Sequence, residues 1–264
     1  MRIALIASAL LGCSACAQAL KEPSPIAAYA PGRAQGRSAS ELVTAANAAW
    51  ARRGDPGSAE RAQGLYLDAA VADEQRVDAL LGAMRALAFR IEYERGAPRG
   101  ELAETAVAIG QWCRRRAPTE PECDYRLAIA LGQQARERPS TGTDAMRHMV
   151  ELLERAIATA PGIDAAGPHR VLALLLLRAP PWPVGPGDPE TALDHARAAV
   201  SLAPRAAANQ LVLGEALVAS GRSAEARAAY TMAIELASAA AKTGDPDAAR
   251  HLAQARSGLA KTRG

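Results

Sequence analysis

Small and apolar residues recur along this chain at a fixed spacing. One such residue is followed by another four positions on, by a third after three more, and by a proline or a substitute five positions further. Residues spaced by four and three lie on one face of an α-helix, so each copy predicts one buried helical stripe, which the proline then ends. The copies are Ala62, Tyr66, Ala69, Glu74; Ala106, Gly110, Cys113, Pro118; Met149, Leu153, Ala156, Pro161; Ala192, Ala196, Ala199, Pro204; and Ala226, Tyr230, Ala233, Ser238.

The steps between copies predict a stack of helix pairs. The first three steps are 44, 43 and 43 residues long and the last is 34. One pair cannot bury its apolar face by itself, so neighbouring pairs should stack into a superhelix with a concave inner wall. The predicted pairs are 39–53 with 58–71, 75–94 with 99–116, 123–137 with 143–160, 167–178 with 189–203, and 206–220 with 223–240, followed by a capping helix over 245–261.

The composition favours an all-α fold. Hydrophobic residues make up 49% of the 264 positions but aromatic residues only 3%. Alanine, the strongest helix former, carries much of the apolar total, and strand-like runs are missing. The sequence therefore predicts an all-α superhelical solenoid of about five degenerate helix pairs plus a C-terminal capping helix. The net charge of +3 is small and the basic residues are scattered, which predicts no nucleic-acid partner.

The last repeat resembles a tetratricopeptide repeat. Its first helix carries Leu213-Gly214 and Leu217, Gly221 makes the turn, and Ala226, Tyr230 and Ala233 follow on the second helix. The step of 34 residues is the repeat length of that family. The longer steps depart from it, and we assign their extra residues to loops inserted between paired helices, at 138–143 and 179–188. The repeat domain is expected to cover residues 38–264.

Residues 1–19 are typical of an export signal. Arg2 precedes a short apolar run, from Ile3 to Leu11, that is about half of the roughly 20 residues needed to span a bilayer. Leu10-Leu11-Gly12-Cys13 resembles a lipobox, which predicts removal of residues 1–12 and a lipid on Cys13 in a periplasm-facing protein. Cys16 is a weaker site. The alternative is cleavage after Ala19, at Ala17-Gln18-Ala19, which would release a soluble protein. Residues 20–37, rich in Pro, Ala and Gly, are expected to form a flexible tether.

Two cysteines remain in the repeat domain. Cys113 and Cys123 lie ten residues apart. In an oxidising compartment such a pair predicts a disulfide, and two free buried cysteines are the alternative. Two sulfurs without further ligands do not make a zinc site.

The sequence contains no recognisable catalytic constellation. His148, His169, His195 and His251 lie in no H-E-x-x-H arrangement, and nucleophile-elbow, Walker and dinucleotide-binding motifs are missing. We therefore predict a protein that is not an enzyme and that has no cofactor, no metal site and no catalytic residues.

The segment from Ala179 to Asp188 is the most unusual in the chain. It holds four prolines and Trp182. A rigid proline-rich backbone with an indole suits a contact surface, and a loop packed over the helix ends is the alternative. We name His169, Arg170, Trp182 and Asp188 as the candidate contact surface.

The stretch from His169 to Pro204 resembles the T-component family of bacterial TRAP transporters. The resemblance rests on the helix Arg170–Leu177, on Ala179-Pro180-Pro181-Trp182-Pro183, on Gly185-Pro186-Gly187-Asp188-Pro189, and on the alanine-rich helix that follows. The Cys113 to Cys123 connection also has the look of that family. The resemblance implies a periplasmic lipoprotein of degenerate tetratricopeptide-like repeats that associates with a solute-binding protein, handles a small hydrophobic ligand and can form homo-oligomers.

Three functions are consistent with these features. An accessory subunit of a solute-uptake system predicts an apolar channel or groove lined by the repeats. A general scaffold lipoprotein for envelope assembly predicts an open concave surface without an enclosed cavity. An enzyme, the least favoured, would need converging polar groups in a pocket.

Overall fold

The computed structural model describes residues 17–32, 34 and 36–262. In this part of the chain eleven α-helices and two short 3₁₀-helices form, and no strand does, so the predicted all-α class is confirmed. The expected lipidation sites, Cys13 and Cys16, lie outside the described residues. The α-helices are α1 (Ala39–Ala51), α2 (Ser58–Ala72), α3 (Val77–Tyr93), α4 (Arg99–Arg116), α5 (Pro121–Glu137), α6 (Gly142–Thr159), α7 (Ile163–Arg178), α8 (Pro189–Leu202), α9 (Ala207–Ala219), α10 (Ser223–Lys242) and α11 (Ala248–Lys261).

Local signals start and stop these helices close to the predicted positions. Ser38 accepts a hydrogen bond from the Glu41 amide while the Glu41 side chain accepts one from the Ser38 amide, so α1 begins with a complete capping box. Asp188 accepts from the amides of Glu190 and Thr191 at the start of α8, where Pro189 occupies the first turn. These caps satisfy backbone groups that would otherwise have no partner.

The repeating positions form the buried stripe of the second helix in each pair. Ala62, Tyr66 and Ala69 are at most 1% exposed, and Ala192, Ala196 and Ala199 are fully buried. The Tyr66 ring packs directly on Gly82: a Cβ atom at position 82 would lie only 2.5 Å from the ring. Tyr230 in the last pair packs against Gly214 in the same way. Glycines on neighbouring helices thus make room for buried tyrosines.

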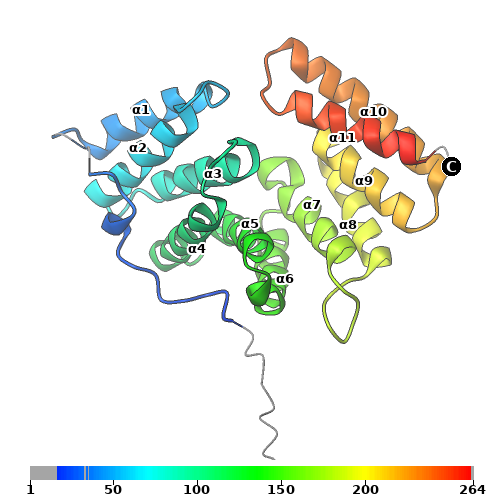
Figure 1. Ribbon diagram of the computed structural model, residues 1–264, viewed down its shortest axis with the longest axis horizontal. Helices are drawn as coiled ribbons and strands as arrows, with labels where there is room; N and C mark the ends of the chain where they lie inside the picture. Colours follow the sequence, from blue (N-terminus) through cyan, green and yellow to red (C-terminus); the bar gives the residue numbers. More distant parts are fainter. Residues whose placement is uncertain (1–16, 33, 35, 263–264) are drawn as a thin grey trace, which may run out of the picture.

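The long repeat steps have a different origin from the one we expected. Helices α3 to α6 contain 17 or 18 residues each, whereas α1 and α9 contain 13. Pairs two and three are therefore longer mainly because their helices are longer. Residues 138–143 do not form an inserted loop, because Pro139–Thr141 form a 3₁₀-helix that leads directly into α6. Only the segment between α7 and α8 projects as a loop (Figure 1).

The helix pairs curve into an arch with two arms, α1–α6 and α7–α11 (Figure 1). The first helices of successive pairs touch one another, α3 with α5, α5 with α7, and α7 with α9, and α9 also touches α11. These helices therefore line the inside of the curve, and the second helices lie outside. None of the described helices combines the length and the apolar character needed to cross a bilayer.

The N-terminal segment is not the flexible tether predicted for residues 20–37. Ala19 and Ile26 are buried, and the Ala19 amide donates to Asp144 at 2.9 Å. Trp112 donates its indole N–H to the Ser24 carbonyl at 2.8 Å. The segment packs along the second helices because its few apolar side chains find partners there, which the loss of periodicity in the sequence did not reveal.

Candidate binding surface on the concave wall

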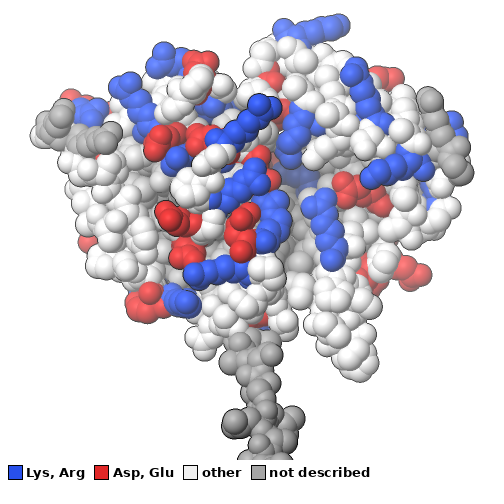
Figure 2. Space-filling model, viewed as in Figure 1, with Lys and Arg blue, Asp and Glu red and all other residues white. Residues whose placement is uncertain are grey.

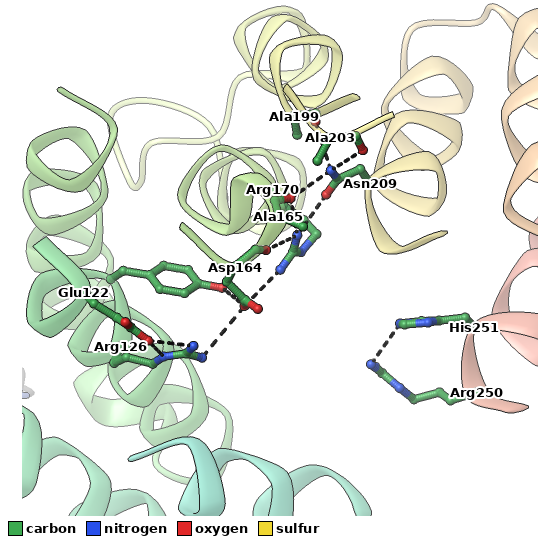
Figure 3. Close-up of polar contacts among 11 residues, drawn as sticks. Glu122, Arg126, Asp164, Ala165, Arg170, Ala199, Ala203, Asn209, Arg250 and His251 are labelled. Atoms are coloured by element: carbon green, nitrogen blue, oxygen red, sulfur yellow. Dashed lines mark hydrogen bonds and ion pairs between the residues drawn. The ribbon is translucent and has the colours of Figure 1, made fainter. Parts of the chain in front are cut away.

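A network of polar side chains joins three repeats on the inner wall (Figure 3). Arg126 on α5 pairs with Glu122 at 3.0 Å and with Asp164 at 3.8 Å. Arg170 on α7 reaches Asp164 from the other side, at 3.2 Å. The Asp164 carboxylate is therefore shared by two arginines that come from neighbouring repeats.

Asp164 begins a left-handed turn inside α7. Asp164, Ala165 and Ala166 have φ angles of 51°, 52° and 63°. Residues with a side chain lose about 1–2 kcal/mol each in this conformation, so the turn needs partners that hold it. Arg170 donates to the carbonyls of Asp164 and Ala165, at 3.2 and 3.1 Å. Regular helical backbone resumes after the turn, at the predicted start of this helix, Gly167.

Asn209 on α9 completes the support of this turn. It is fully buried, and its amide nitrogen donates to the carbonyls of Ala165, Ala199 and Ala203 at 2.9, 2.9 and 3.2 Å. Its side-chain oxygen accepts a hydrogen bond from Arg170 at 2.9 Å. One amide side chain thus satisfies backbone groups of neighbouring helices.

Tyr125 anchors the turn from α5. Its hydroxyl donates to Asp164 at 2.6 Å. Burial raises the pKa of this phenol, the Arg170 charge lowers it, and Asp164 raises it again, with a net rise. The ring packs so closely against Gly167 that a Cβ there would lie 2.2 Å from the hydroxyl oxygen. The phenol therefore remains a hydrogen-bond donor over the physiological pH range.

Arg250 and His251 face this network from α11, on the opposite side of the arch (Figure 3). Burial lowers the pKa of His251 and the Arg250 charge lowers it further, while Asp247 and Asp245 partly oppose this shift. Lys and Arg side chains, with Asp and Glu side chains among them, lie along the middle of the molecule, where the two arms face each other (Figure 2). Three arginines, Arg126, Arg170 and Arg250, therefore border one space.

The two ends of the solenoid touch each other. Arg53, after α1, lies 4.0 Å from Asp247, and the guanidinium of Arg250 lies 5.0 Å from the centre of the Tyr93 ring. Tyr93 stacks on Phe89 with the ring centres 4.4 Å apart. We call these five residues the terminal clasp. It closes the concave wall by bringing the last helix against the first two pairs.

The four residues of the predicted contact surface do not gather in one place. Arg170 belongs to the concave network, whereas Asp188 caps α8. His169 is partly buried, and its Nδ1 lies 2.9 Å from the Nδ1 of His195. Trp182 lies at the loop between α7 and α8 and is 85% exposed, so it does not pack over the helix ends. The prediction of a single surface is therefore wrong, because the adjacent residues His169 and Arg170 point to different sides of α7 and the loop carries Trp182 out into solvent.

The sequence missed several residues of the concave site. Glu122 and Arg126 are four residues apart, which predicts a helical ion pair but not its position on the inner wall. Asn209 carries no motif. Arg250 lies on the capping helix and reaches the site only because the arch closes.

Cys113 and Cys123 lie together at the join of α4 and α5. Both are fully buried, and their Cα atoms are 5.5 Å apart in a disulfide. This separation is ordinary for a disulfide. The neighbouring Asp124 accepts two hydrogen bonds from Arg155 on α6, both at 3.0 Å. The geometry accommodates the predicted bond, which a change of mass on reduction and alkylation would test.

The clefts of the described chain do not resemble an apolar channel. One of about 630 Å³ lies between the N-terminal segment and helices α2 and α3. Its lining includes Arg61, Gln63, Asp68 and Arg90. Such a lining does not fit the small hydrophobic ligand that the family resemblance implies. Over the described residues no three or more His, Cys, Asp or Glu side chains converge as a metal site would require.

The arrangement of the helices has a counterpart among solved structures. A thermophilic tetratricopeptide-repeat protein of Thermus thermophilus matches with a TM-score of 0.61 and 19% identity, over 83% of this chain and 98% of that one. The fold is a tetratricopeptide-repeat solenoid. Two crystal structures of MamA match with TM-scores of 0.49 and 0.46, at 18% and 20% identity, over 78% and 70% of this chain and 96% and 92% of theirs. No family model and no curated protein matches the chain.

Solenoids of stacked repeats can serve as scaffolds for protein–protein interaction. Stacked repeats present an extended concave surface, and partners bind along it. Here that surface is bordered by guanidinium groups, which recognise carboxylates with two parallel hydrogen bonds. The concave wall can therefore bind a partner segment that carries acidic groups.

Proposed function

We propose that this chain is an exported lipoprotein that holds a partner protein on its concave wall at a bacterial membrane. In this proposal it serves as an accessory subunit, similar to a T-component, of a TRAP-type solute uptake system and docks a periplasmic solute-binding protein. The support for this finer role is the resemblance of the stretch from His169 to Pro204. The observation that carries the binding function is that Arg126 and Arg170 on the concave wall are faced by Arg250 from α11 (Figure 3).

The packing of the N-terminal segment supports lipidation over cleavage after Ala19. The Ala19 side chain is 1% exposed and its amide donates to Asp144. Cleavage after Ala19 would remove both contacts, whereas processing at Cys13 would keep them. Palmitate labelling tests this directly: we expect Cys13→Ala to abolish the label. Persistence of the label would move the site to Cys16.

Pull-down of the full-length lipidated protein from its own envelope tests the partner. We expect a solute-binding protein to be recovered with it. Recovery of only assembly or wall-synthesis proteins would contradict the uptake role and favour a scaffold in envelope assembly.

A charge variant tests whether the concave wall makes the contact. Arg126→Gln removes one guanidinium from the wall, and we expect recovery of the partner to fall about tenfold or more, since charged hydrogen bonds contribute about 1.5–3 kcal/mol each. Arg227→Gln is the matched control because Arg227 lies exposed on α10. Melting temperatures of both variants report whether they remain folded. Equal recovery by both variants would remove the concave wall from the proposal.

A further inference from the structure

The loop between α7 and α8 presents apolar side chains to solvent. Trp182 is 85% exposed and Val184 is 64% exposed, the two highest values among the large hydrophobic residues of the described chain. From Ala179 to Gly187 the loop contains no charged residue. Figure 2 shows its tip as an uncharged projection at the lower edge of the molecule. An exposed tryptophan and valine side by side in a charge-free loop need an explanation, because exposed apolar patches mark interaction sites.

The loop is held in shape by its own backbone. The Gly187 amide donates to the Pro180 carbonyl at 2.9 Å, and the Val184 amide donates to the Pro181 carbonyl at 3.1 Å. A Cβ on Gly187 would lie 2.3 Å from the Ala179 carbonyl oxygen, so the neck of the loop closes only because glycine is there. Trp182 is therefore presented by a narrow, internally bonded loop.

The loop points the same way as the start of the described chain. Both the α7–α8 loop and the N-terminal end of the ribbon lie at the lower edge of the molecule in Figure 1. The Ala17 amide donates to the Ser140 carbonyl at 3.2 Å, which attaches this end to the start of α6. Cys13 precedes Ala17 by four residues, and an extended chain spans about 3.5 Å per residue, or roughly 14 Å here. A lipid on Cys13 would thus hold this edge, and the loop with it, near the bilayer.

The geometry points to a second membrane contact: the loop from Ala179 to Asp188 inserts Trp182 and Val184 into the interfacial region of the bilayer that carries the lipid anchor. This inference rests on the anchor of the proposed function. Tryptophan prefers the membrane–water interface, where its ring is buried and its N–H stays near polar groups. The uncharged tip should enter zwitterionic and anionic surfaces alike, because it carries no basic residue that would seek anionic lipids. Two contacts on one edge would fix the orientation of the arch, whereas a lipid on a short segment alone would leave it free to rotate.

Depth-dependent quenching of Trp182 tests the contact. The full-length lipidated protein is placed in vesicles of phosphatidylethanolamine and phosphatidylglycerol that contain brominated phospholipid. The emission of Trp182 is the difference between wild type and Trp182→Phe. We expect this difference to be quenched and shifted to the blue, while the emission of Trp50 and Trp112 stays unchanged, since neither lies in the loop.

The unlipidated chain provides a measurement that is independent of the anchor. With both Cys13 and Cys16 replaced by Ala, the protein should bind the same vesicles weakly, and Trp182→Ala with Val184→Ser should weaken that binding at least tenfold, because the burial of even one large apolar side chain contributes about that much. Leu202→Ala is the matched control, because Leu202 is 50% exposed at the opposite end of α8.

The outcomes separate this inference from the proposed function. Palmitate label with unquenched Trp182 would overturn the loop contact and leave the anchor standing. Protection of Trp182 only when a protein partner is added would also overturn it, in favour of a protein contact. If no label is found, the anchor fails, and vesicle binding of the unlipidated chain then decides: binding that depends on Trp182 supports the loop contact, and no binding overturns it.

Discussion

At the scale of single residues, the concave wall depends on polar side chains that satisfy backbone groups of other helices. Asn209 donates to the Ala165 carbonyl within the left-handed turn and to the Ala199 carbonyl near the end of α8, and Arg170 donates to two carbonyls within the turn. The turn departs from helical geometry, and its carbonyls accept hydrogen bonds from these side chains. These two side chains therefore hold a backbone conformation that the local sequence would not choose.

Replacing Asn209 should loosen the join between the fourth and fifth pairs. Asn209→Ala removes one donor from each of the carbonyls of Ala165, Ala199 and Ala203, and also the acceptor of one Arg170 hydrogen bond. We expect a loss of about 1–3 kcal/mol in the free energy of unfolding. Urea denaturation followed by circular dichroism measures it. Gln254→Ala, at an exposed position of α11, is the control and should change little. An unchanged midpoint for Asn209→Ala would contradict the role of Asn209.

The pair His169 and His195 should make stability depend on pH. Burial lowers the pKa of both side chains; His195 lowers that of His169 further, while Asp194 and Glu154 partly oppose the shift at His195. Both folded pKa values therefore lie below the ordinary value of 6.5. The unfolded chain binds more protons in that window, so stability is complete above about pH 6.5 and declines as the pH falls below it. We expect the melting temperature to drop between about pH 7.5 and 5.5, and to drop less in His169→Gln. Equal pH profiles would contradict this.

At the scale of elements, buried tyrosines set how closely neighbouring helices approach. Tyr66, Tyr125 and Tyr230 each lie against a glycine on another helix, at distances that no Cβ could share. A ring packed on bare backbone gives close helix contact in a core that otherwise consists largely of alanine and leucine. Tyr66 and Tyr125 meet a glycine of the next pair, whereas Tyr230 meets Gly214 of its own pair and Gly258 of the capping helix. These contacts bring the helices on either side close together.

Gly167→Ala tests this packing of tyrosine on glycine at the position where the tyrosine, Tyr125, also supports the left-handed turn. The added methyl must displace the Tyr125 ring or shift α7, and overpacking of this kind costs about 1–3 kcal/mol. Gly100→Ala is the matched control, because nothing lies within 4 Å of a Cβ at that helical position. It should be neutral or stabilise slightly, by up to about 1 kcal/mol, since alanine favours helix over glycine. Similar unfolding midpoints for the two variants would be inconsistent with the packing described.

At the scale of the whole molecule, the terminal clasp turns an open solenoid into a closed arch. Its contacts are an ion pair and a cation–π contact near the surface. Contacts of this kind contribute about 0.5–1 kcal/mol each. The closed form is therefore only modestly favoured by the clasp, and a partner that enters the concave wall need not overcome a large barrier to opening.

Removing the clasp should shift the arch toward open forms. Arg250→Gln combined with Asp247→Asn removes both contacts, and we expect the ratio of open to closed forms to rise about fivefold to thirtyfold, from about 1–2 kcal/mol in total. Spin labels at Ala51→Cys and Ala253→Cys report the distance between the two ends. The distance distribution should broaden toward longer values while helical content stays constant. A narrow, unshifted distribution, as expected for Arg227→Gln, would contradict the role of the clasp.

The sequence determined the helices themselves. Every predicted helix forms. When α7 is counted from the end of its left-handed turn, all predicted helix ends except one lie within two residues of the observed ends. The exception is the capping helix, which begins three residues after its predicted start. This succeeds because the 3.6-residue period, Ser38, Pro189 and the prolines between repeats act within one or two turns of chain. The buried stripe was predicted for the same reason, since burial of Ala196 and Ala199 follows from their spacing.

Only the tertiary structure decided which residues meet. The left-handed turn at Asp164 depends on Asn209, whose hydrogen bond to Ala165 joins positions 44 residues apart. Arg250 faces Arg126 because small rotations between successive helix pairs add up to a closed arch. No local sequence pattern encodes the accumulated rotation of the helix pairs. The same holds at the lower edge of the molecule: the sequence predicted a lipid anchor on Cys13 and an unusual loop, and the curvature of the solenoid brings the start of the described chain and that loop to one side.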